Sequence, residues 1–168
     1  MYFFSGAPPA VFLPCCRTPL ALPPARFFSV HALYTDMTGK SPFRTTLIAP
    51  CGMNCAICMT FLREKNRCGG CYAPDRLCSI NCTISSCDQV RGRYNHSCGA
   101  FPCRRLKQLD KRYRTKYHMS MIENLDAIKR DGIRSFVRSE RERWSCKACG
   151  GTIDIHHYRC SECGREPE

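Results

Sequence analysis

The sequence predicts a small α+β protein whose stability comes from its cysteines more than from a large apolar core. The 168 residues include 16 cysteines, and ten of these fall between positions 51 and 103. Several of the cysteines form Cys-x-x-Cys pairs, which are typical of metal sites. The remaining apolar residues would build only a small core, and such chains need disulfides or metals. We therefore predict a metal-stabilised fold with a disordered N-terminal tail, a cysteine-rich knuckle module, a short helical region and a C-terminal zinc ribbon.

The paired spacing of the cysteines favours metal binding over a disulfide framework. Two thiolates in one Cys-x-x-Cys turn can reach the same tetrahedral ion. Glycines follow several of the pairs, and their positive φ lets backbone amides turn towards the sulfurs. A secreted disulfide scaffold would instead combine irregular spacing with a signal peptide. Metal-bound thiolates imply a reducing, cytoplasmic setting, and the disulfide framework is the less favoured alternative.

Residues 1–45 differ in composition from the rest of the chain and predict a disordered tail. Prolines stand at positions 8, 9, 14, 19, 23 and 24, and would break any helix. No apolar run is long enough to span a bilayer, and no secretory signal is evident, so we expect no membrane contact. Arg17 and Arg26, with no acidic residue before Asp36, leave an organellar transit peptide as the weaker alternative. Translation from Met37 would also explain the break, and residues 1–36 would then lie outside the native protein.

Residues 48–103 predict a metal-binding module with two four-cysteine sites. The first site combines two Cys-x-x-Cys pairs: Cys55, Cys58, Cys68 and Cys71. A short helix is expected over residues 56–65. The second site has longer spacers that can still surround one ion: Cys82, Cys87, Cys98 and Cys103. Further candidate ligands are Cys51, Cys78 and His96, so the assignment of cysteines to sites stays open.

The spacing Cys51-x3-Cys55-x2-Cys58 resembles the cluster-binding loop of radical S-adenosylmethionine enzymes, in which three thiolates hold a 4Fe-4S cluster. Ile57 stands where that family usually has an aromatic residue. The 65 residues after Cys103 are also too few for its barrel, which typically takes about 250 residues. This enzyme class is therefore disfavoured. A 4Fe-4S cluster without that chemistry remains an alternative to zinc, because all-cysteine sites suit both.

Residues 102–143 predict a helical region, and its first helix carries the strongest basic patch of the chain. Pro102 suits the first position of this helix. An apolar stripe at helical spacing consists of Leu106, Leu109, Tyr113 and Tyr117. The basic side chains around it are candidate contacts to the phosphates of nucleic acid: Arg104, Arg105, Lys107, Lys111, Arg112, Arg114 and Lys116. The alternative is that they form the solvated face of a packed amphipathic helix.

Two further helices follow in the same region. Ser120 and Glu123 form a capping box at the start of the second helix, which ends near Gly132 in a left-handed cap. Ile133 opens the third helix, whose mixed charges predict an exposed surface. His118 has no companion at metal-site spacing and is expected at a helix end.

Residues 144–165 carry the most specific signal of the sequence. Two Cys-x-x-Cys-Gly knuckles lie ten residues apart and enclose a predicted β-strand over residues 152–155. This pattern predicts a zinc ribbon with four ligands: Cys146, Cys149, Cys160 and Cys163. Four thiolates close the site, which makes it structural and not catalytic, and His156 and His157 are not needed as ligands.

Several motifs, in order, resemble a cysteine-rich domain-of-unknown-function family of bacteria and archaea, number 3795 in its series. The motifs are Cys51-Gly-Met-Asn-Cys55, Cys68-Gly-Gly-Cys71, Phe101-Pro-Cys103, Leu109-Asp-Lys-Arg-Tyr-Arg114 and the terminal knuckles. They cover roughly residues 48–165. The resemblance implies zinc binding and a prokaryotic, cytoplasmic setting, and it implies no reaction. Relatives would carry cysteines near position 95 and at position 154, where this chain has Asn95 and Asp154, so His96 could serve as a substitute ligand.

The sequence favours a binding function over catalysis. It contains no Ser/His/Asp set, phosphate loop or HExxH motif. The net charge of +12 favours acidic partners. We therefore predict a metal-binding interaction module with about three Zn²⁺ sites that contacts nucleic acid or an acidic protein. The alternative is an iron–sulfur redox protein or sensor that uses Cys51, Cys55 and Cys58.

Overall fold

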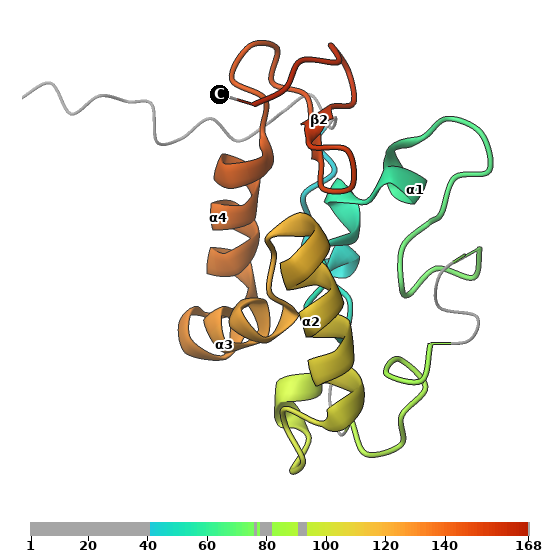
Figure 1. Cartoon of the computed structure of the whole chain (residues 1–168), viewed down its shortest axis with the longest axis vertical. Helices are drawn as coiled ribbons and strands as arrows, with labels where there is room; N and C mark the ends of the chain where they lie inside the picture. The colour runs from blue at the N-terminus through green and yellow to red at the C-terminus, as the bar shows by residue number, and fades with distance from the viewer. Residues whose placement is uncertain (1–40, 76, 78–81, 91–93, 168) are drawn as a thin grey trace, which may run out of the picture. The chain divides into compact units, whose positions relative to one another are not determined.

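The arrangement of the chain is given by a computed structural model (Figure 1), which describes residues 41–75, 77, 82–90 and 94–167. Its main helices are α2 (Arg104–Tyr117), α3 (Met121–Asp131) and α4 (Ile133–Trp144). Helix α3 packs against both α2 and α4. The predicted helical region is therefore present. No helix in these ranges is long and apolar enough to cross a membrane.

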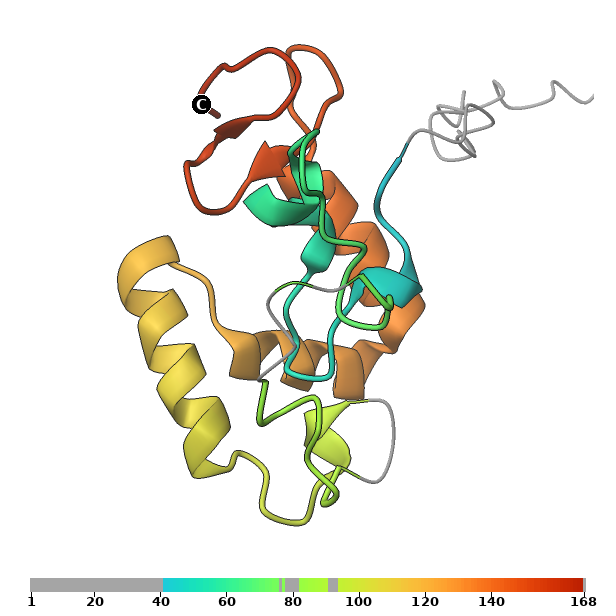
Figure 2. The same ribbon diagram turned by 90° about the vertical axis from the view of Figure 1, so that its right-hand side faces the viewer.

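The remaining elements are short. Before α2 the chain forms the 3-10 helices η2 (Thr45–Leu47), η3 (Cys55–Ile57) and η4 (Asn95–Ser97) and the single-turn helix α1 (Met59–Leu62). After α4 it forms one antiparallel hairpin of β1 (Ile153–Asp154) and β2 (Arg159–Cys160), in which Ile153 pairs with Cys160. Two views of the ribbon place this hairpin beside η3 and α1 (Figures 1 and 2). The mixed α and β character agrees with the predicted class.

Three local predictions need correction. Cys103 is the N-cap of α2, so Pro102 lies before the helix and not at its first position. The helix predicted over residues 56–65 is divided into η3 and α1, because the backbone of Cys58 is extended (φ −84°, ψ 131°). The predicted tail extends too far, since Phe43 is buried in the core; residues 1–40 lie outside the described residues.

The joint between α2 and α3 is a network around Asp110. The hydroxyl of Ser120 donates to Asp110 Oδ1 at 2.7 Å, and the backbone N–H of Ile122 donates to the same oxygen at 3.0 Å. Ser120 also accepts from the backbone N–H of Glu123, as the predicted capping box requires. The Glu123 side chain does not return to the cap, because it accepts a hydrogen bond from Arg114 instead. The capping box is therefore half formed.

The core is organised around the loop of residues 49–57. Gly52 (φ +86°) lies directly under α3, where a Cβ atom would stand 2.6 Å from the backbone oxygen of Met121. Its own carbonyl accepts a hydrogen bond from Asn124 Nδ2 at 2.9 Å. Only glycine allows both this φ and this close approach. The loop and α3 therefore pack backbone to backbone, and fully buried Leu125 lies beside the contact.

Asn54 joins the same loop to α4. Its side-chain oxygen accepts from the backbone N–H of Ala56 and so caps η3, while its Nδ2 donates to Glu140 Oε2 at 3.0 Å. Glu140 is only 4% exposed. The prediction of an exposed charged face on the third helix is therefore wrong at this position, because the glutamate satisfies a buried amide from a distant part of the chain.

A graded series of glycine substitutions would test the contact between the loop and α3. Gly52→Ala should lower the free energy of unfolding by about 3–5 kcal/mol, because a strained backbone and overpacking add. Gly132→Ala, at φ +81° but in open space, should cost about 1–3 kcal/mol. Gly99→Ala has neither problem and should stay within about 0.5 kcal/mol. Urea unfolding followed by circular dichroism measures all three, and equal losses at Gly52 and Gly132 would contradict the close approach.

The buried glutamate predicts a pH-dependent difference in stability. Burial raises the pKa of Glu140, and the hydrogen bond from Asn54 and the charge of Arg143 offset this only in part. The folded state therefore holds the proton more tightly than the unfolded chain, and stability falls as pH rises from about 4.3. Glu140→Gln keeps the hydrogen bond without the charge, so its advantage over the wild type should grow as pH rises.

Urea unfolding of the two proteins between pH 4 and pH 8 would measure this difference, because the change begins near the pKa of the unfolded glutamate, about 4.3. A difference in unfolding free energy that stays constant over this range of pH would contradict a raised pKa of Glu140. Glu140→Ala is the matched control, because it also removes the acceptor for Asn54. It should be less stable than Glu140→Gln by about 1–3 kcal/mol at every pH, because neither variant carries the titrating carboxyl.

Candidate metal centre

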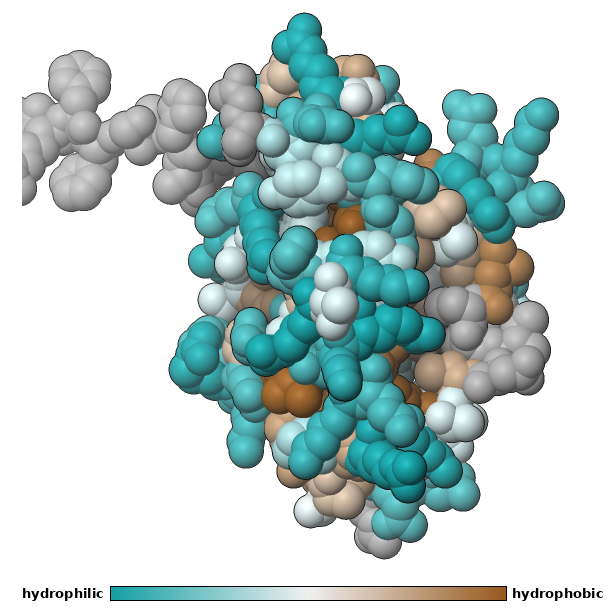
Figure 3. Space-filling view, viewed as in Figure 1, coloured by the Kyte–Doolittle hydropathy of each residue, from teal (hydrophilic) through white to brown (hydrophobic). Residues whose placement is uncertain are grey.

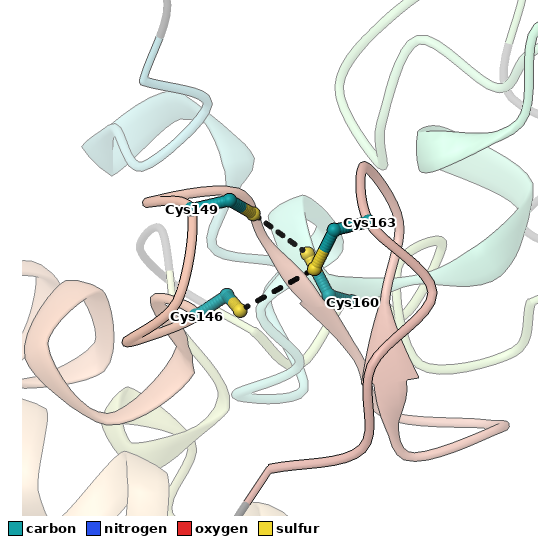
Figure 4. A group of neighbouring side chains, drawn as sticks. All are labelled: Cys146, Cys149, Cys160 and Cys163. Carbon is teal, nitrogen blue, oxygen red and sulfur yellow. Dashed lines mark hydrogen bonds between the residues drawn. The ribbon is translucent and has the colours of Figure 1, made fainter.

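The four C-terminal cysteines come together at one point of the hairpin (Figure 4). Cys146 and Cys149 lie on the turn after α4, and Cys160 and Cys163 lie at and after β2. Their sulfur atoms all lie within 4.8 Å of one another. In the part of the chain that the structure describes, this is the one group of three or more candidate metal ligands with such spacing. The four cysteines predicted for the last site are therefore brought together.

The separations of the sulfurs match a single tetrahedral ion. The Sγ atoms of Cys146 and Cys163 are 3.8 Å apart, and those of Cys149 and Cys160 are 3.5 Å apart. A tetrahedron with metal–sulfur bonds of about 2.3 Å has edges of about 3.8 Å. The site can thus hold a metal ion with little rearrangement, and all four of its ligands would be sulfur.

The two halves of the site repeat the same turn. The N–H of Gly150 donates to the carbonyl of Cys146 at 2.8 Å, and the N–H of Gly164 donates to the carbonyl of Cys160 at 3.0 Å. Both glycines have positive φ, 76° and 71°. This confirms the reason expected for glycine after each pair. The turns direct backbone amides at the sulfurs, as when Gly151 N–H donates to Cys149 Sγ at 3.4 Å.

The thiols of this group differ in acidity. The backbone N–H groups of Cys149 and Ala148 donate to the sulfur of Cys146 and lower its pKa to about 7. At Cys149 the amide of Gly151 also favours the thiolate, but the neighbouring sulfurs of Cys163 and Cys160 outweigh it and raise the pKa to about 12. Without a cation the sulfurs therefore compete for protons. Metal binding would release these protons and would weaken as pH falls.

The hairpin is fixed to the rest of the chain by hydrogen bonds at its turn. The N–H of Ile155 donates to the carbonyl of Ile57 at 3.0 Å, and the N–H of Met59 donates to His156 Nδ1 at 3.4 Å. The ring of His156 also lies edge-on to Tyr117, 4.8 Å between centroids. Sequence reasoning treated His156 only as a surplus ligand. Its role in docking could not be found, because no spacing relates it to residue 59.

Asp154 fixes the turn from inside. Burial raises its pKa, yet hydrogen bonds with the backbone N–H of His156 and the ring of His157 outweigh the burial and hold the pKa below the usual range. The carboxylate therefore stays ionised and orders both histidines. Asp154 therefore stabilises the turn, and it is not one of the four sulfur ligands.

The central cysteines are arranged differently from the predicted sets. No disulfide joins the cysteines that the structure describes. The two predicted four-cysteine sites do not appear among the described groups with ligand atoms within 4.8 Å, and Cys78 lies outside the described residues. A single cavity is instead bordered by Cys51, Cys55, Cys71 and Cys82. The assignment of the central ligands stays a prediction.

Several of the other predicted ligands have local partners. Cys58 Sγ lies 3.1 Å from the hydroxyl of Thr60, and Cys68 Sγ accepts from the N–H of Leu77 at 3.3 Å. Cys98 Sγ accepts from the N–H of Ala100 at 3.4 Å. Each of these sulfurs thus has a hydrogen-bond partner in the segment that follows it.

The basic face predicted on the first helix lies on α2, and hydrophilic side chains gather over this helix (Figure 3). Not all of its cations are available. Arg114 is held by Asp110 at 2.9 Å and by Glu123 at 2.8 Å. Arg105 donates to the carbonyl of Thr83 at 3.0 Å. The remaining predicted contacts are exposed: Arg104, Lys107, Lys111, Arg112 and Lys116.

A groove of about 960 Å³ adjoins the cysteine group. It lies between the ends of α2 and α4 and the hairpin, and Cys146 forms part of its wall. Its aromatic side chains include Tyr117, Trp144 and the exposed Tyr158, whose ring meets Trp144 edge-on at 6.4 Å. Its cations outnumber its carboxylates by four to two: Lys116, Arg143, Lys147 and Arg165 against Glu142 and Glu166. Sequence reasoning missed this groove, because its walls come from three separate segments.

No model of a known protein family matches the chain, and no curated protein or solved structure is similar to it. The resemblance to the cysteine-rich family number 3795 therefore stays a prediction, and the functional argument depends on the geometry of the chain itself.

Proposed function

We propose that the C-terminal cysteines bind one structural Zn²⁺ as a zinc ribbon, and that the ion holds in place a groove for single-stranded nucleic acid. The observation that carries the proposal is the group of four sulfurs at single-ion spacing in the wall of an aromatic, cationic groove. Zinc is the ion that closed four-cysteine sites of this spacing most often bind. With no open coordination position, the ion would act on structure and not on a substrate.

The chemistry of the groove favours nucleic acid over an acidic protein. Non-specific single-strand sites combine a cationic channel with aromatic rings on which bases stack. Tyr158 is 57% exposed, so its ring is accessible to a base. Arg143 lies over the Trp144 ring at 5.0 Å, so cationic and aromatic groups are already combined there. Paired bases are stacked on one another, so an exposed ring suits single strands better than duplex.

The net charge and α2 support the same partner. The chain carries +12, and Lys116 belongs both to the exposed basic face of α2 and to the groove. A strand in the groove could therefore continue along α2, where Lys111 and Arg112 are one turn away. Each phosphate contact releases counterions, so the affinity would depend strongly on salt.

Loss of one sulfur should disable the zinc site. Cys149→Ser should weaken zinc binding by more than about 100-fold, since even changes beside a metal ligand cost 10- to 100-fold. Competition with a coloured chelator under argon measures the affinity. The chain has one tryptophan, Trp144, which is 3% exposed beside this site, so its emission should shift to longer wavelength when zinc is removed.

His157→Gln is the matched control for the zinc site, because it alters the same hairpin outside the sulfur set. It should retain zinc with little change. Unchanged affinity in Cys149→Ser, or equal losses in both variants, would contradict a site closed by four cysteines.

Stacking in the groove should depend on Tyr158. Tyr158→Ala should weaken binding of the zinc-loaded protein to oligo(dT) or oligo(U) by about 5- to 150-fold, which corresponds to a stacking contribution of 1–3 kcal/mol. Quenching of Trp144 emission at low salt measures the binding. Tyr72→Ala is the control, because Tyr72 is similarly exposed but does not line the groove. No quenching and no binding at low salt would exclude nucleic acid and leave an acidic protein as the partner.

The salt dependence should identify the phosphate contacts. Lys147→Ser should reduce the slope of log affinity against log salt by about 0.7, which is the value for one contact on a single strand. Lys129→Ser, on the exposed side of α3 and outside the groove, should leave the slope unchanged. Equal changes in both variants would show that only the net charge matters.

A further inference from the structure

The cavity bordered by Cys51, Cys55, Cys71 and Cys82 belongs to no part of the proposed function. Its volume is about 470 Å³, and it lies between the loop of residues 49–55, the segment of residues 82–84 and α2. The four cysteines reach it from three stretches that are well separated in the sequence. The fold therefore gathers four thiols at one cavity, which the pairing of neighbouring cysteines did not predict.

Backbone amides are directed at the two inner sulfurs of this cavity. The N–H of Met53 donates to the sulfur of Cys51, and the N–H of Cys71 donates to the sulfur of Cys55. Amide donors of this kind stabilise a thiolate more than a thiol. The same arrangement surrounds the C-terminal sulfurs, where the fold is suited to a metal ion. The cavity thus shares this donor pattern with the C-terminal group.

Cys55 is only 7% exposed, and Cys51, Cys71 and Cys82 line the same cavity. Several thiolates this close together and shielded from water need positive charge among them. Arg105 and Arg112 also line the cavity, and Arg105 is held beside Cys82 by its hydrogen bond to Thr83. They supply positive charge to offset an excess of thiolates.

The spacing of the sulfurs distinguishes this cavity from the C-terminal group. In the C-terminal group all four sulfurs lie within 4.8 Å of one another. The four sulfurs of the cavity do not meet this criterion. A single ion needs its ligands near one point, whereas in a cluster each thiolate binds a different iron and the sulfurs stand farther apart. The wider spacing of the four cavity sulfurs fits a cluster better than a single ion.

We propose that this cavity is a second cysteine-ligated centre, and that Cys51, Cys55, Cys71 and Cys82 hold an iron–sulfur cluster in it. This set differs from the Cys51-x3-Cys55-x2-Cys58 loop. Cys58 is a neighbour of Cys55 but does not line the cavity, and its sulfur lies against the hydroxyl of Thr60. The centre is independent of the zinc site and of the groove.

The test is reconstitution of the full chain with ferrous iron and sulfide under argon. The wild type should gain a band near 400 nm and about four iron and four acid-labile sulfide per chain, as a 4Fe-4S cluster contains. Cys71→Ser and Cys82→Ser should lose most of the band. Cys58→Ser and Cys87→Ser, outside the cavity, should keep it.

The same samples also show whether each variant is folded. Cys82 is only partly buried, so its replacement should leave the far-UV circular dichroism and the zinc content of the C-terminal site unchanged. Cys149→Ser should lose zinc and keep the band, which separates the failure of one centre from the failure of the other.

Three results would overturn the proposal. The first is a colourless protein without sulfide after reconstitution, whatever zinc it holds. The second is a full band in folded Cys71→Ser and Cys82→Ser. The third is loss of the band in Cys58→Ser with retention in Cys71→Ser, which would assign the cluster to the Cys51-x3-Cys55-x2-Cys58 loop.

Discussion

The packing of the residue 49–57 loop against α3 and α4 is the contact on which the rest of the structure depends. Gly52 allows the backbone of α3 to approach closely. Asn54 caps η3 and donates a hydrogen bond to Glu140 on α4. The same loop carries Cys51 and Cys55 to the wall of the central cavity. One short stretch therefore sets both the core of the helices and the position of the buried thiols, so changes in its packing would affect both.

The two cysteine groups solve different physical problems. At the C-terminus, the hairpin has only two short strands and buries Ile153 and Ile155, and a bound ion would add cohesion to its two glycine turns. In the centre, the thiols lie among buried apolar side chains, where charge is costly unless it is compensated. The first group is thus suited to holding a fold together. The second is suited to holding a charged group away from water.

The sequence was informative wherever the structure is local. The C-terminal cysteines, the helices after residue 103 and Ser120 as an N-cap all follow from spacing or from single-residue preferences. The left-handed cap predicted at Gly132 is wrong, because its φ is positive but its ψ is 156°. The central ligands could not be assigned, because the cavity joins Cys51 and Cys55 to more distant cysteines and no spacing encodes that pairing. The buried Glu140 was also missed, since its partner lies 86 residues away.

The hydrogen bond from Ile155 to the carbonyl of Ile57 has a consequence for how the chain can be divided. The C-terminal hairpin resembles a small independent zinc-binding unit in sequence. Its turn, however, contacts the backbone of η3 and α1, and His156 accepts a hydrogen bond from the N–H of Met59. A fragment that stops before the hairpin would leave these groups uncovered at the edge of the core. The knuckles therefore complete the surface of the core at this edge, and an excised hairpin would not report how they behave when they are packed against it.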